Sequence, residues 1–259
     1  MRRYANFLRA LGKIQGRQAQ GFATFFLRNR AELELIRQVA ERRTTTDPLR
    51  VAVLGCGTGP EAYSVAWRIQ SARPDLKLIL HAVDISEQAL EVGRCGRYSL
   101  VTPQLTNKPI FQRMTRAEMD ELFDRDGDTL TVKPWIREVI KWHVGDVGEP
   151  DILDVLGPQD IVLANNFLCH MDNPEAERCL RNLARLVTPN GFLFVSGIKL
   201  DVRTKVAEDL GWQPIQESLE EILNKTRPDW RLRYAAAFQL VSASDAARCH
   251  RLAEEVPTG

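Results

Sequence analysis

The chain has 259 residues, of which 44% are hydrophobic, so it is long enough to bury one large core or two small ones. Its 35 lysine and arginine residues balance 34 acidic ones, so no overall field draws it to nucleic acid or a membrane. Apolar runs stay short of the ~20 residues of a spanning helix. Five scattered cysteines without zinc spacing lead us to expect no metal and a reduced, cytoplasmic setting.

Helical and extended patterns alternate along most of the chain. Residues 30–43 repeat apolar side chains with a helical period, and the segment TTTDP ends that helix before a strand at residues 50–54. A helix begins near Glu61, a buried strand covers residues 76–84, and Ser86 then caps a second helix. The later predicted elements are strands at residues 139–146, 160–165 and 191–197, and a helix over 173–186.

This alternation predicts βαβ units and a mostly parallel sheet. Residues 99–138 interrupt it with a longer connection, which contains a helix-like segment, RAEMDELF, and a turn, DRDGD. The tail combines a helix over residues 201–211 with an extended run at 231–241, which would form an antiparallel edge. We therefore expect a helical N-terminal segment over residues 1–46 and one α/β domain over 47–259.

A glycine-rich turn, LGCGTGPEAYS at residues 54–64, joins the first strand of this domain to its first helix. Gly55, Gly57 and Gly59 are spaced G-x-G-x-G and Pro60 follows, which departs from the dinucleotide pattern G-x-G-x-x-G. No Lys-Ser or Lys-Thr follows, so a phosphate-binding P-loop does not fit either. A tight turn without a ligand is the alternative. Because each glycine raises the entropy lost on folding, we favour a close approach of backbone to a ligand.

Polar residues stand where the other strands end, which is where open α/β sheets bind ligands. Asp84 ends the second strand, where a carboxylate can accept two hydrogen bonds from ribose hydroxyls. After the third strand, Asp146 is placed to accept from an adenine amine and Val147 to donate its N–H. The fourth strand ends in Asn165 and Asn166. Either aspartate alone is also typical of a helix cap. Together they fit an adenosine ligand without phosphate, of which S-adenosylmethionine (SAM) is the common example.

Several segments resemble the chemotaxis-receptor glutamate methyltransferases, the CheR family. GTGPEAYSVAW resembles the family's glycine loop and following helix, and TFFLR at residues 24–28 resembles its T-x-F-F-R. The likeness continues through AVDISEQALEVGRCGRYS, VKPWIREVIKW, DIVLANNFLCHM and TPNGFLFVSG, over about residues 20–200. The resemblance implies an α/β fold of the Rossmann-like class I SAM-methyltransferase type, with helices on both faces and a short helical N-terminal segment.

The resemblance also implies roles at the matching positions. Thr24 and Arg28 would hold the methionine end of SAM, with Arg28 bound to its carboxylate, and Glu61 would lie near its cationic amino group. Arg28 as a surface cation and Glu61 as a residue favoured by the helix dipole are the alternatives. The remaining cofactor-binding residues would be Gly55 and Gly57 in the turn, Asp84 at the ribose, Asp146 and Val147 at the adenine, and Asn165 and Asn166 at the family's Arg-Asn pair.

Two departures from the family bear on the acceptor. His170 replaces the tyrosine that lies beside the transferring methyl group in the family's R-N-V-x-I-Y-F motif, and Asn165 replaces the arginine. A carboxylate acceptor needs only orientation, whereas a hydroxyl, amine or acidic carbon must lose a proton, which histidine can take. The alternative is a histidine that merely packs at a turn.

The second departure concerns the parts that dock on a receptor. We expect the chain to lack the family's small β-subdomain and its fuller N-terminal helical domain. The aromatic residues of the head would form either an apolar lid or the buried face of a helix; they are Tyr4, Phe7, Phe22, Phe25 and Phe26.

The sequence therefore predicts a SAM-dependent methyltransferase that acts on a small-molecule acceptor by in-line displacement. His170 and Asn165 are the candidate catalytic residues, with His170 as the base. Three alternatives stay open. The first is methylation of protein glutamates. The second is cleavage of another carbon–sulfur bond of SAM, with aminopropyl transfer or cyclisation that releases methylthioadenosine. The third is a SAM-binding regulator without turnover. The oligomeric state is not predicted.

Overall fold

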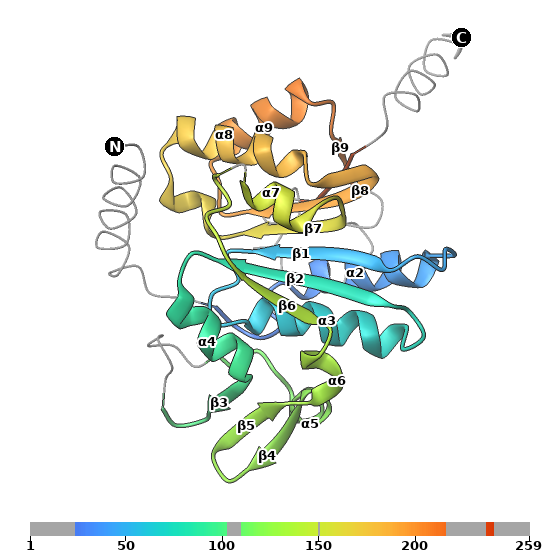
Figure 1. The fold of residues 1–259 in the computed structure, drawn as a ribbon, viewed down its shortest axis with the longest axis vertical. Coiled ribbons are helices and arrows are strands. Elements are labelled where there is room, and N and C mark those ends of the chain that lie inside the picture. The colour runs from blue at the N-terminus through green and yellow to red at the C-terminus, as the bar shows by residue number, and fades with distance from the viewer. Residues whose placement is uncertain (1–23, 103–109, 150, 216–236, 241–259) are drawn as a thin grey trace, which may run out of the picture.

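The computed structural model describes residues 24–102, 110–149, 151–215 and 237–240. A seven-stranded sheet forms its centre, with the strand order β6-β2-β1-β7-β8-β10-β9 (Figure 1). Its strands are β1 (Leu49–Leu54), β2 (Leu78–Asp84), β6 (Ile140–Val144), β7 (Gln159–Asn165), β8 (Val187–Ser196), β9 (Gln213–Pro214) and β10 (Ala237–Gln239).

The pairing of the strands confirms the predicted parallel sheet. β1 pairs in parallel with β2 on one side and with β7 on the other, and β6 and β8 extend the sheet in parallel outward. β10 runs antiparallel to β8 and β9, as predicted for the tail; residues 231–236 and 241 of that predicted run lie outside the described residues. The strand order reverses beside β1, so the carboxyl ends of β1 and β7 form the edge where such sheets bind ligands.

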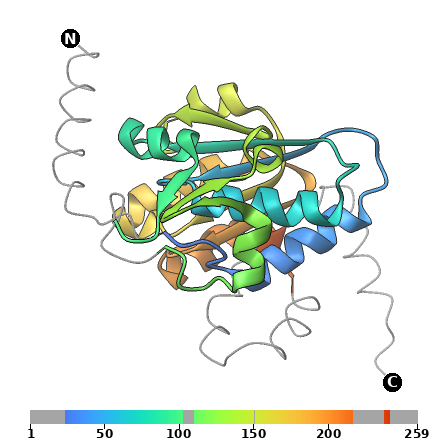
Figure 2. The same ribbon diagram turned by 90° about the horizontal axis from the view of Figure 1, so that it is seen from below.

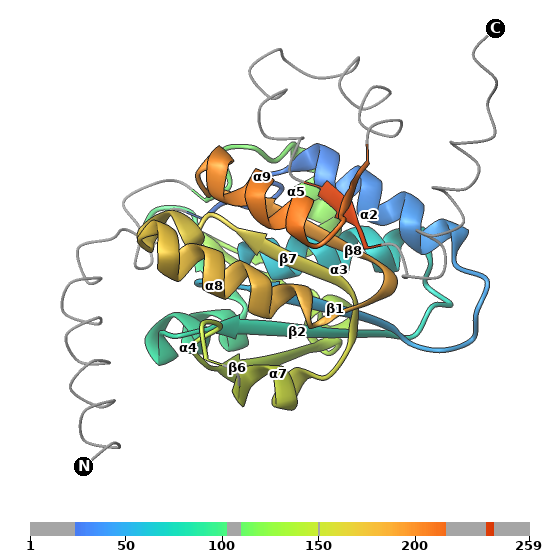
Figure 3. The same ribbon diagram turned by 90° about the horizontal axis from the view of Figure 1, so that it is seen from above.

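Helices cover both faces of the sheet, as predicted. One apolar cluster joins one face to α2 (Arg30–Arg42), α3 (Pro60–Ala72) and α4 (Glu87–Cys95). A second cluster joins the other face to α7 (Asp151–Leu156), α8 (Asn173–Ala184) and α9 (Leu200–Asp209). Figure 2 shows α2 beside α3, and Figure 3 shows α8 beside α9.

Local sequence explains where these helices begin. Pro60 occupies the first turn of α3, where a missing N–H removes no helical hydrogen bond. The Ser86 hydroxyl accepts from the Ala89 N–H at 3.2 Å, which confirms Ser86 as the cap of α4. On α2, Leu33, Ile36 and Ala40 are buried along one stripe, as the helical period predicts.

A second, separate sheet was not predicted from the sequence. Between α4 and β6 the chain forms a three-stranded antiparallel sheet in the order β3-β5-β4, at the end of the molecule opposite α8 and α9 (Figure 1). Its elements are β3 (Arg97–Ser99), α5 (Arg116–Leu122), β4 (Phe123–Asp126), β5 (Thr129–Val132) and α6 (Pro134–Arg137). The helix and the turn predicted within 99–138 are present, but the small sheet to which the turn belongs was not predicted. Its strands have only three or four residues, and several of these residues are charged. Such short strands show little of the alternation of apolar and polar residues by which a strand is predicted.

Aromatic packing fixes the N-terminal segment to this insertion. The Phe26 ring is fully buried, with its centroid 5.3 Å from that of Tyr98, 5.5 Å from that of Phe111 and 5.0 Å from that of Phe123. Phe25 is buried as well, and both aromatics precede α2, so they do not lie on the face of a helix. Tyr4, Phe7 and Phe22 lie outside the described residues.

Candidate cofactor-binding site

The glycine turn between β1 and α3 has a left-handed backbone at each glycine. The φ angles of Gly55, Gly57 and Gly59 are 66°, 55° and 97°, a region that L side chains rarely adopt. A Cβ atom on Gly55 would lie 2.8 Å from the Phe167 ring, and one on Gly59 would lie 2.7 Å from the Trp142 ring. The chain's own packing therefore requires glycine at both of these positions, independently of any ligand.

Asp84 connects this turn to the end of β2. Its carboxylate is buried; Oδ2 accepts from the Gly57 N–H at 2.7 Å and Oδ1 from the Ser86 N–H at 2.9 Å. Each carboxylate oxygen has a second lone pair, so Asp84 can organise the turn and still accept hydrogen bonds from a ligand.

At the end of β6, as at the end of β2, an aspartate accepts from the backbone N–H two residues later. Asp146 follows β6, and its Oδ1 accepts from the Gly148 N–H at 2.9 Å. Val147 is buried against the cluster under α7 and α8. The Gly145 N–H donates to the Asp84 carbonyl at 3.0 Å, so the ends of β2 and β6 are held side by side.

Arg28 is carried by a strained turn just before α2. Leu27 has a positive φ of 52°, and its N–H donates to the Ser64 hydroxyl of α3 at 3.0 Å. Arg113 donates to the Arg28 carbonyl at 2.7 Å. These contacts direct the Arg28 guanidinium to Asn166, where Nη2 donates to Oδ1 at 3.1 Å. Thr24, the first residue that the structure describes, is partly buried.

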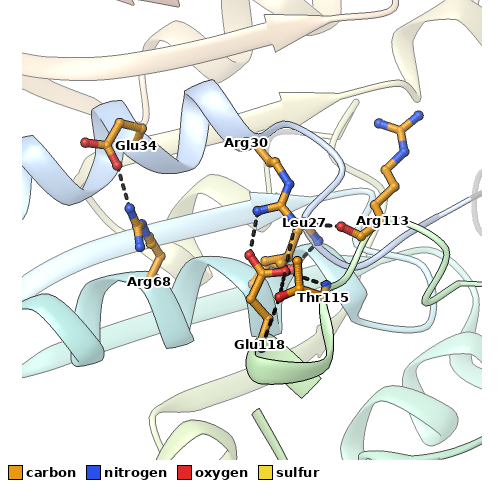
Figure 4. A network of polar contacts seen from close by, with 8 residues as sticks. Leu27, Arg30, Glu34, Arg68, Arg113, Thr115 and Glu118 are labelled. Carbon is orange, nitrogen blue, oxygen red and sulfur yellow. Dashed lines mark hydrogen bonds and ion pairs between the residues drawn. The ribbon is translucent and has the colours of Figure 1, made fainter. Parts of the chain in front are cut away.

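A polar network beside Arg28 fixes the same turn to its neighbours (Figure 4). Arg30 donates to both carboxylate oxygens of Glu118 at 2.6 and 2.8 Å, and to the Arg113 carbonyl at 2.6 Å. Farther along α2, Glu34 pairs with Arg68 of α3 at 2.5 Å. Exposed pairs of this kind contribute only about 0–1 kcal/mol each. They connect α2 to α5 through Arg30 and to α3 through Glu34.

The centre of the site is a hydrogen-bonded group of three side chains from three elements. The Asn165 amide, at the end of β7, donates to Glu32 Oε2 at 2.8 Å and to Glu61 Oε1 at 2.9 Å. The Asn165 carbonyl oxygen accepts from the Ser196 hydroxyl at 2.7 Å, which fixes the orientation of the amide. A cavity of about 10 Å³, room for about one water molecule, is lined in part by Arg28, Glu32 and Glu61.

Both carboxyl groups of this centre hold protons more tightly than usual. Burial, followed by the charge of Glu61, raises the pKa of Glu32 to about 8. Burial also raises the pKa of Glu61, although the Asn165 hydrogen bond and the Arg28 charge oppose the increase. Sequence analysis missed Glu32. The signal was its place four residues before Ile36, on the apolar stripe of α2.

His170 lies at the rim of the site. It is the last residue of the 3₁₀ helix η1 (Leu168–His170), which begins three residues after the end of β7. Its N–H donates to the Phe167 carbonyl at 3.1 Å, and its side chain is exposed. Asn166 has a positive φ of 61°, and the Gly197 backbone packs against it so closely that a Cβ there would lie 2.7 Å from the Asn166 Cα.

The structure thus brings most of the sequence-predicted residues together in three sets, to which Thr24 and His170 do not belong. Arg28 joins Asn166, and Glu61 joins Asn165. Asp84 joins the glycine turn and the end of β6, where Asp146 and Val147 follow. Within the described parts of the chain, no three His, Cys, Asp or Glu side chains are placed to hold a metal ion. No described helix is long and apolar enough to cross a membrane.

A sheet of this strand order, with a glycine turn after β1 and a carboxylate at the end of β2, defines a Rossmann-like SAM-dependent methyltransferase domain. The chain belongs to the CheR methyltransferase family: residues 23–200, more than half of its length, match that family's SAM-binding domain. SAM is accordingly the cofactor. The residues present fit it, because they offer a guanidinium for a carboxylate, carboxyl groups for an ammonium and a strand-end carboxylate for ribose hydroxyls.

Two curated relatives come from Pseudomonas aeruginosa. The probable biofilm formation methyltransferase WspC is 24% identical over 69% of this chain and 40% of its own length. Chemotaxis protein methyltransferase 2 is 26% identical over 66% of this chain and 60% of its own length. The chain therefore spans less than two thirds of either relative. Among solved structures, the magnesium protoporphyrin IX methyltransferase from Synechocystis PCC 6803 with bound SAM covers 72% of this chain and 72% of its own, with a TM-score of 0.40 and 16% identity.

Proposed function

We propose that the protein transfers a methyl group from SAM to a small-molecule acceptor that loses a proton in the reaction. The observation that carries this proposal is the position of His170. It is exposed at the end of η1, four residues after Asn166, where the family resemblance places a tyrosine. An exposed imidazole at that point is accessible to an acceptor and able to take its proton.

The amino-acid end of the cofactor would lie against the group that Asn165 organises. Arg28 would bind its carboxylate and Glu61 its ammonium group, with Thr24 beside them. Asn166 would hold the Arg28 guanidinium in place through the hydrogen bond of 3.1 Å. These roles are supported by the opposite charges of Arg28 and Glu61 beside one small cavity.

The adenosyl end would lie along the neighbouring strand ends. Asp84 would accept from the ribose hydroxyls, and Asp146 and Val147 would bind the adenine. Gly55 and Gly57 would let the turn approach the cofactor. Since the Asp84 carboxylate already receives the Gly57 N–H, a change at Asp84 would alter both the ribose contact and the turn.

The protein's contribution to the reaction would be mainly alignment. Asn165 and Asn166 are fixed by hydrogen bonds to Glu61 and Arg28, so the end of β7 is rigid where the acceptor would approach. His170 would take the acceptor's proton at a ring nitrogen as the new bond to carbon forms.

A second candidate function is methylation of carboxyl groups on a protein. The separate three-stranded sheet favours it, because the lack of such a part was one reason to expect a small acceptor. The relatives are described as a biofilm formation methyltransferase and a chemotaxis protein methyltransferase. A carboxylate acceptor would need no base, so His170 would then only position it.

Methyl-labelled SAM distinguishes these functions. The purified protein is incubated with it and an extract of the encoding organism, separated by ultrafiltration into small molecules and proteins. A labelled small molecule that is chromatographically distinct from SAM and is absent with His170→Phe supports the first function. Label on protein that alkali releases as methanol supports the second. Release of methylthioadenosine from SAM alone would replace both with aminopropyl chemistry. Binding without any turnover would indicate a regulator.

A further inference from the structure

Glu32 is part of the site, but the cofactor-binding roles proposed above do not include it. We propose that Glu32 and Glu61 together receive the ammonium group at the amino-acid end of SAM, and that this pair holds one proton which cofactor binding releases. The inference rests on the proposed function, in which that ammonium group lies at Glu61. It adds one binding residue and one proton to that arrangement.

The geometry supports a pair that acts as a unit. A single amide nitrogen of Asn165 donates to both carboxyl groups, at 2.8 Å to Glu32 and 2.9 Å to Glu61. The same Glu32 oxygen accepts from the Asn29 amide at 3.1 Å. Glu32 is 5% exposed and Glu61 is partly exposed, and both line the cavity beside Arg28. Two carboxyl groups therefore converge on the Asn165 amide, beside a cavity with room for about one further small polar group.

The charged groups around Glu32 and Glu61 favour a state in which the two carboxyl groups share one proton. Arg28, just before α2, is the cation whose charge opposes the raised pKa of both carboxyl groups. Asn29 and Asn165 are neutral. The Cys56 thiol of the glycine turn is also near Glu61, but burial raises its pKa well above the ordinary value and keeps it neutral. Two ionised carboxylates facing one guanidinium would leave an uncompensated buried charge, so Glu32, with a pKa of about 8, keeps its proton at neutral pH.

An ammonium group in the cavity changes this balance. Its positive charge contacts the two carboxyl groups directly, whereas the ligand's carboxylate, which adds a negative charge, pairs with Arg28. The nearby ammonium group therefore lowers the pKa of Glu32, both carboxyl groups ionise, and the proton of Glu32 passes to the buffer. The stoichiometry is one carboxylic acid and one ammonium ion converted to one carboxylate–ammonium pair and one free proton. No bond of the cofactor is formed or broken in this step.

The competing interpretation is that Glu32 is a buried acid with a structural role only, holding Asn29 and Asn165 in place. In that case it keeps its proton whether or not the cofactor is bound. Mutagenesis read by activity alone would not separate the two interpretations, since either role affects the site. The number of protons released on binding separates them directly.

Isothermal titration calorimetry measures that number. SAM is titrated into the protein at pH 6.5 in phosphate and in imidazole, and the dependence of the heat on the ionisation enthalpy of the buffer gives the protons released. At this pH a carboxyl group with a pKa of about 8 is almost fully protonated and the ligand's amino group almost fully charged. We expect release of about 0.9 proton per SAM, and an affinity that rises roughly tenfold from pH 6 to pH 7.

Two further ligands locate the effect. S-adenosylhomocysteine keeps the amino-acid end but lacks the sulfonium, so it should release the same proton. Methylthioadenosine lacks the amino-acid end and should bind without proton release. This comparison uses the unmodified protein, so it remains informative even if a substitution prevents folding.

A matched pair of variants identifies the group. Glu32→Gln should bind SAM with release of less than about 0.2 proton and an affinity that is nearly constant between pH 6 and 7. Glu34→Gln makes the same change on the same helix, at a carboxyl group whose pKa Arg37 and Arg68 hold near about 2. It should release as many protons as the unmodified protein.

Proton release below about 0.2 by the unmodified protein, with SAM bound, would overturn the inference and leave the cofactor assignment intact. The same holds for equal release by methylthioadenosine, or by Glu32→Gln. If SAM and S-adenosylhomocysteine both fail to bind the unmodified protein, the proposed function itself fails, and this inference fails with it.

Discussion

Replacing Glu32 with glutamine should stabilise the cofactor-free protein, and increasingly so as the pH rises. The pKa of Glu32 rises from 4.5 to about 8 on folding, chiefly because its carboxyl group is buried. Between these values the unfolded chain has released a proton that the folded protein retains, so the free energy of unfolding falls with increasing pH. Glutamine fills the same space, can still accept from Asn165 and has no proton to lose.

The magnitude follows from the pKa of Glu32. At about 1.4 kcal/mol per pH unit, the destabilisation is under about 1 kcal/mol at pH 5, about 3 kcal/mol at pH 7 and about 4 kcal/mol at pH 8. Urea unfolding at these three pH values, followed by tryptophan fluorescence, should show the stabilities of the two proteins diverging accordingly. Glu34→Gln is the control, because the pKa of Glu34 stays near about 2 and its effect should not vary over this range.

Parallel stability curves for Glu32→Gln and the unmodified protein would refute this reasoning, since they would mean that Glu32 ionises alike in the folded and unfolded states. Divergence would show that the fold carries a destabilising carboxyl group at its site. Such a trade of stability for function is common at binding sites.

Three other substitutions test separate parts of the account. Asp84→Ala should weaken SAM binding by about 1.5–3 kcal/mol in calorimetry and lower stability by a similar amount, because the Gly57 N–H loses its buried acceptor; unchanged affinity would make Asp84 only a cap. His170→Phe should lower the turnover rate by about 10²–10⁴ with SAM affinity unchanged, whereas a retained rate would remove its role as base. His81 is buried, 2.9 Å from His143, and burial lowers its pKa to about 4. The stability of the unmodified protein relative to His81→Asn should therefore fall by about 3 kcal/mol between pH 7 and 4; a difference that stays constant with pH would contradict the assignment.

The main sheet was predictable because its strands carry strong local signals. The strands at residues 76–84 and 160–165 are nearly continuous apolar runs, and an aspartate or a pair of asparagines marks their carboxyl ends. The expected position of the cofactor follows from this pattern, because the ends of parallel strands meet at one edge. Asp84 and Asn165 became candidate site residues in this way.

The small sheet and Glu32 were not predictable from local patterns. β3 has three residues, and the only other strands of its sheet are the short hairpin β4–β5, so its existence depends on pairing across the insertion. Glu32 acquires its role through Asn165, which is 133 residues away in sequence. Its place on an apolar helical stripe marks it as unusual, but only the fold shows which residues face it.

The structure of the complex with S-adenosylhomocysteine tests the central claim most directly, because it shows where each end of the ligand binds. The account predicts the amino nitrogen about 3 Å from carboxyl oxygens of both Glu32 and Glu61, the carboxylate at Arg28 and the ribose hydroxyls at Asp84. An amino-acid end bound away from Glu61 and Arg28, or a ribose that does not contact Asp84, would contradict it.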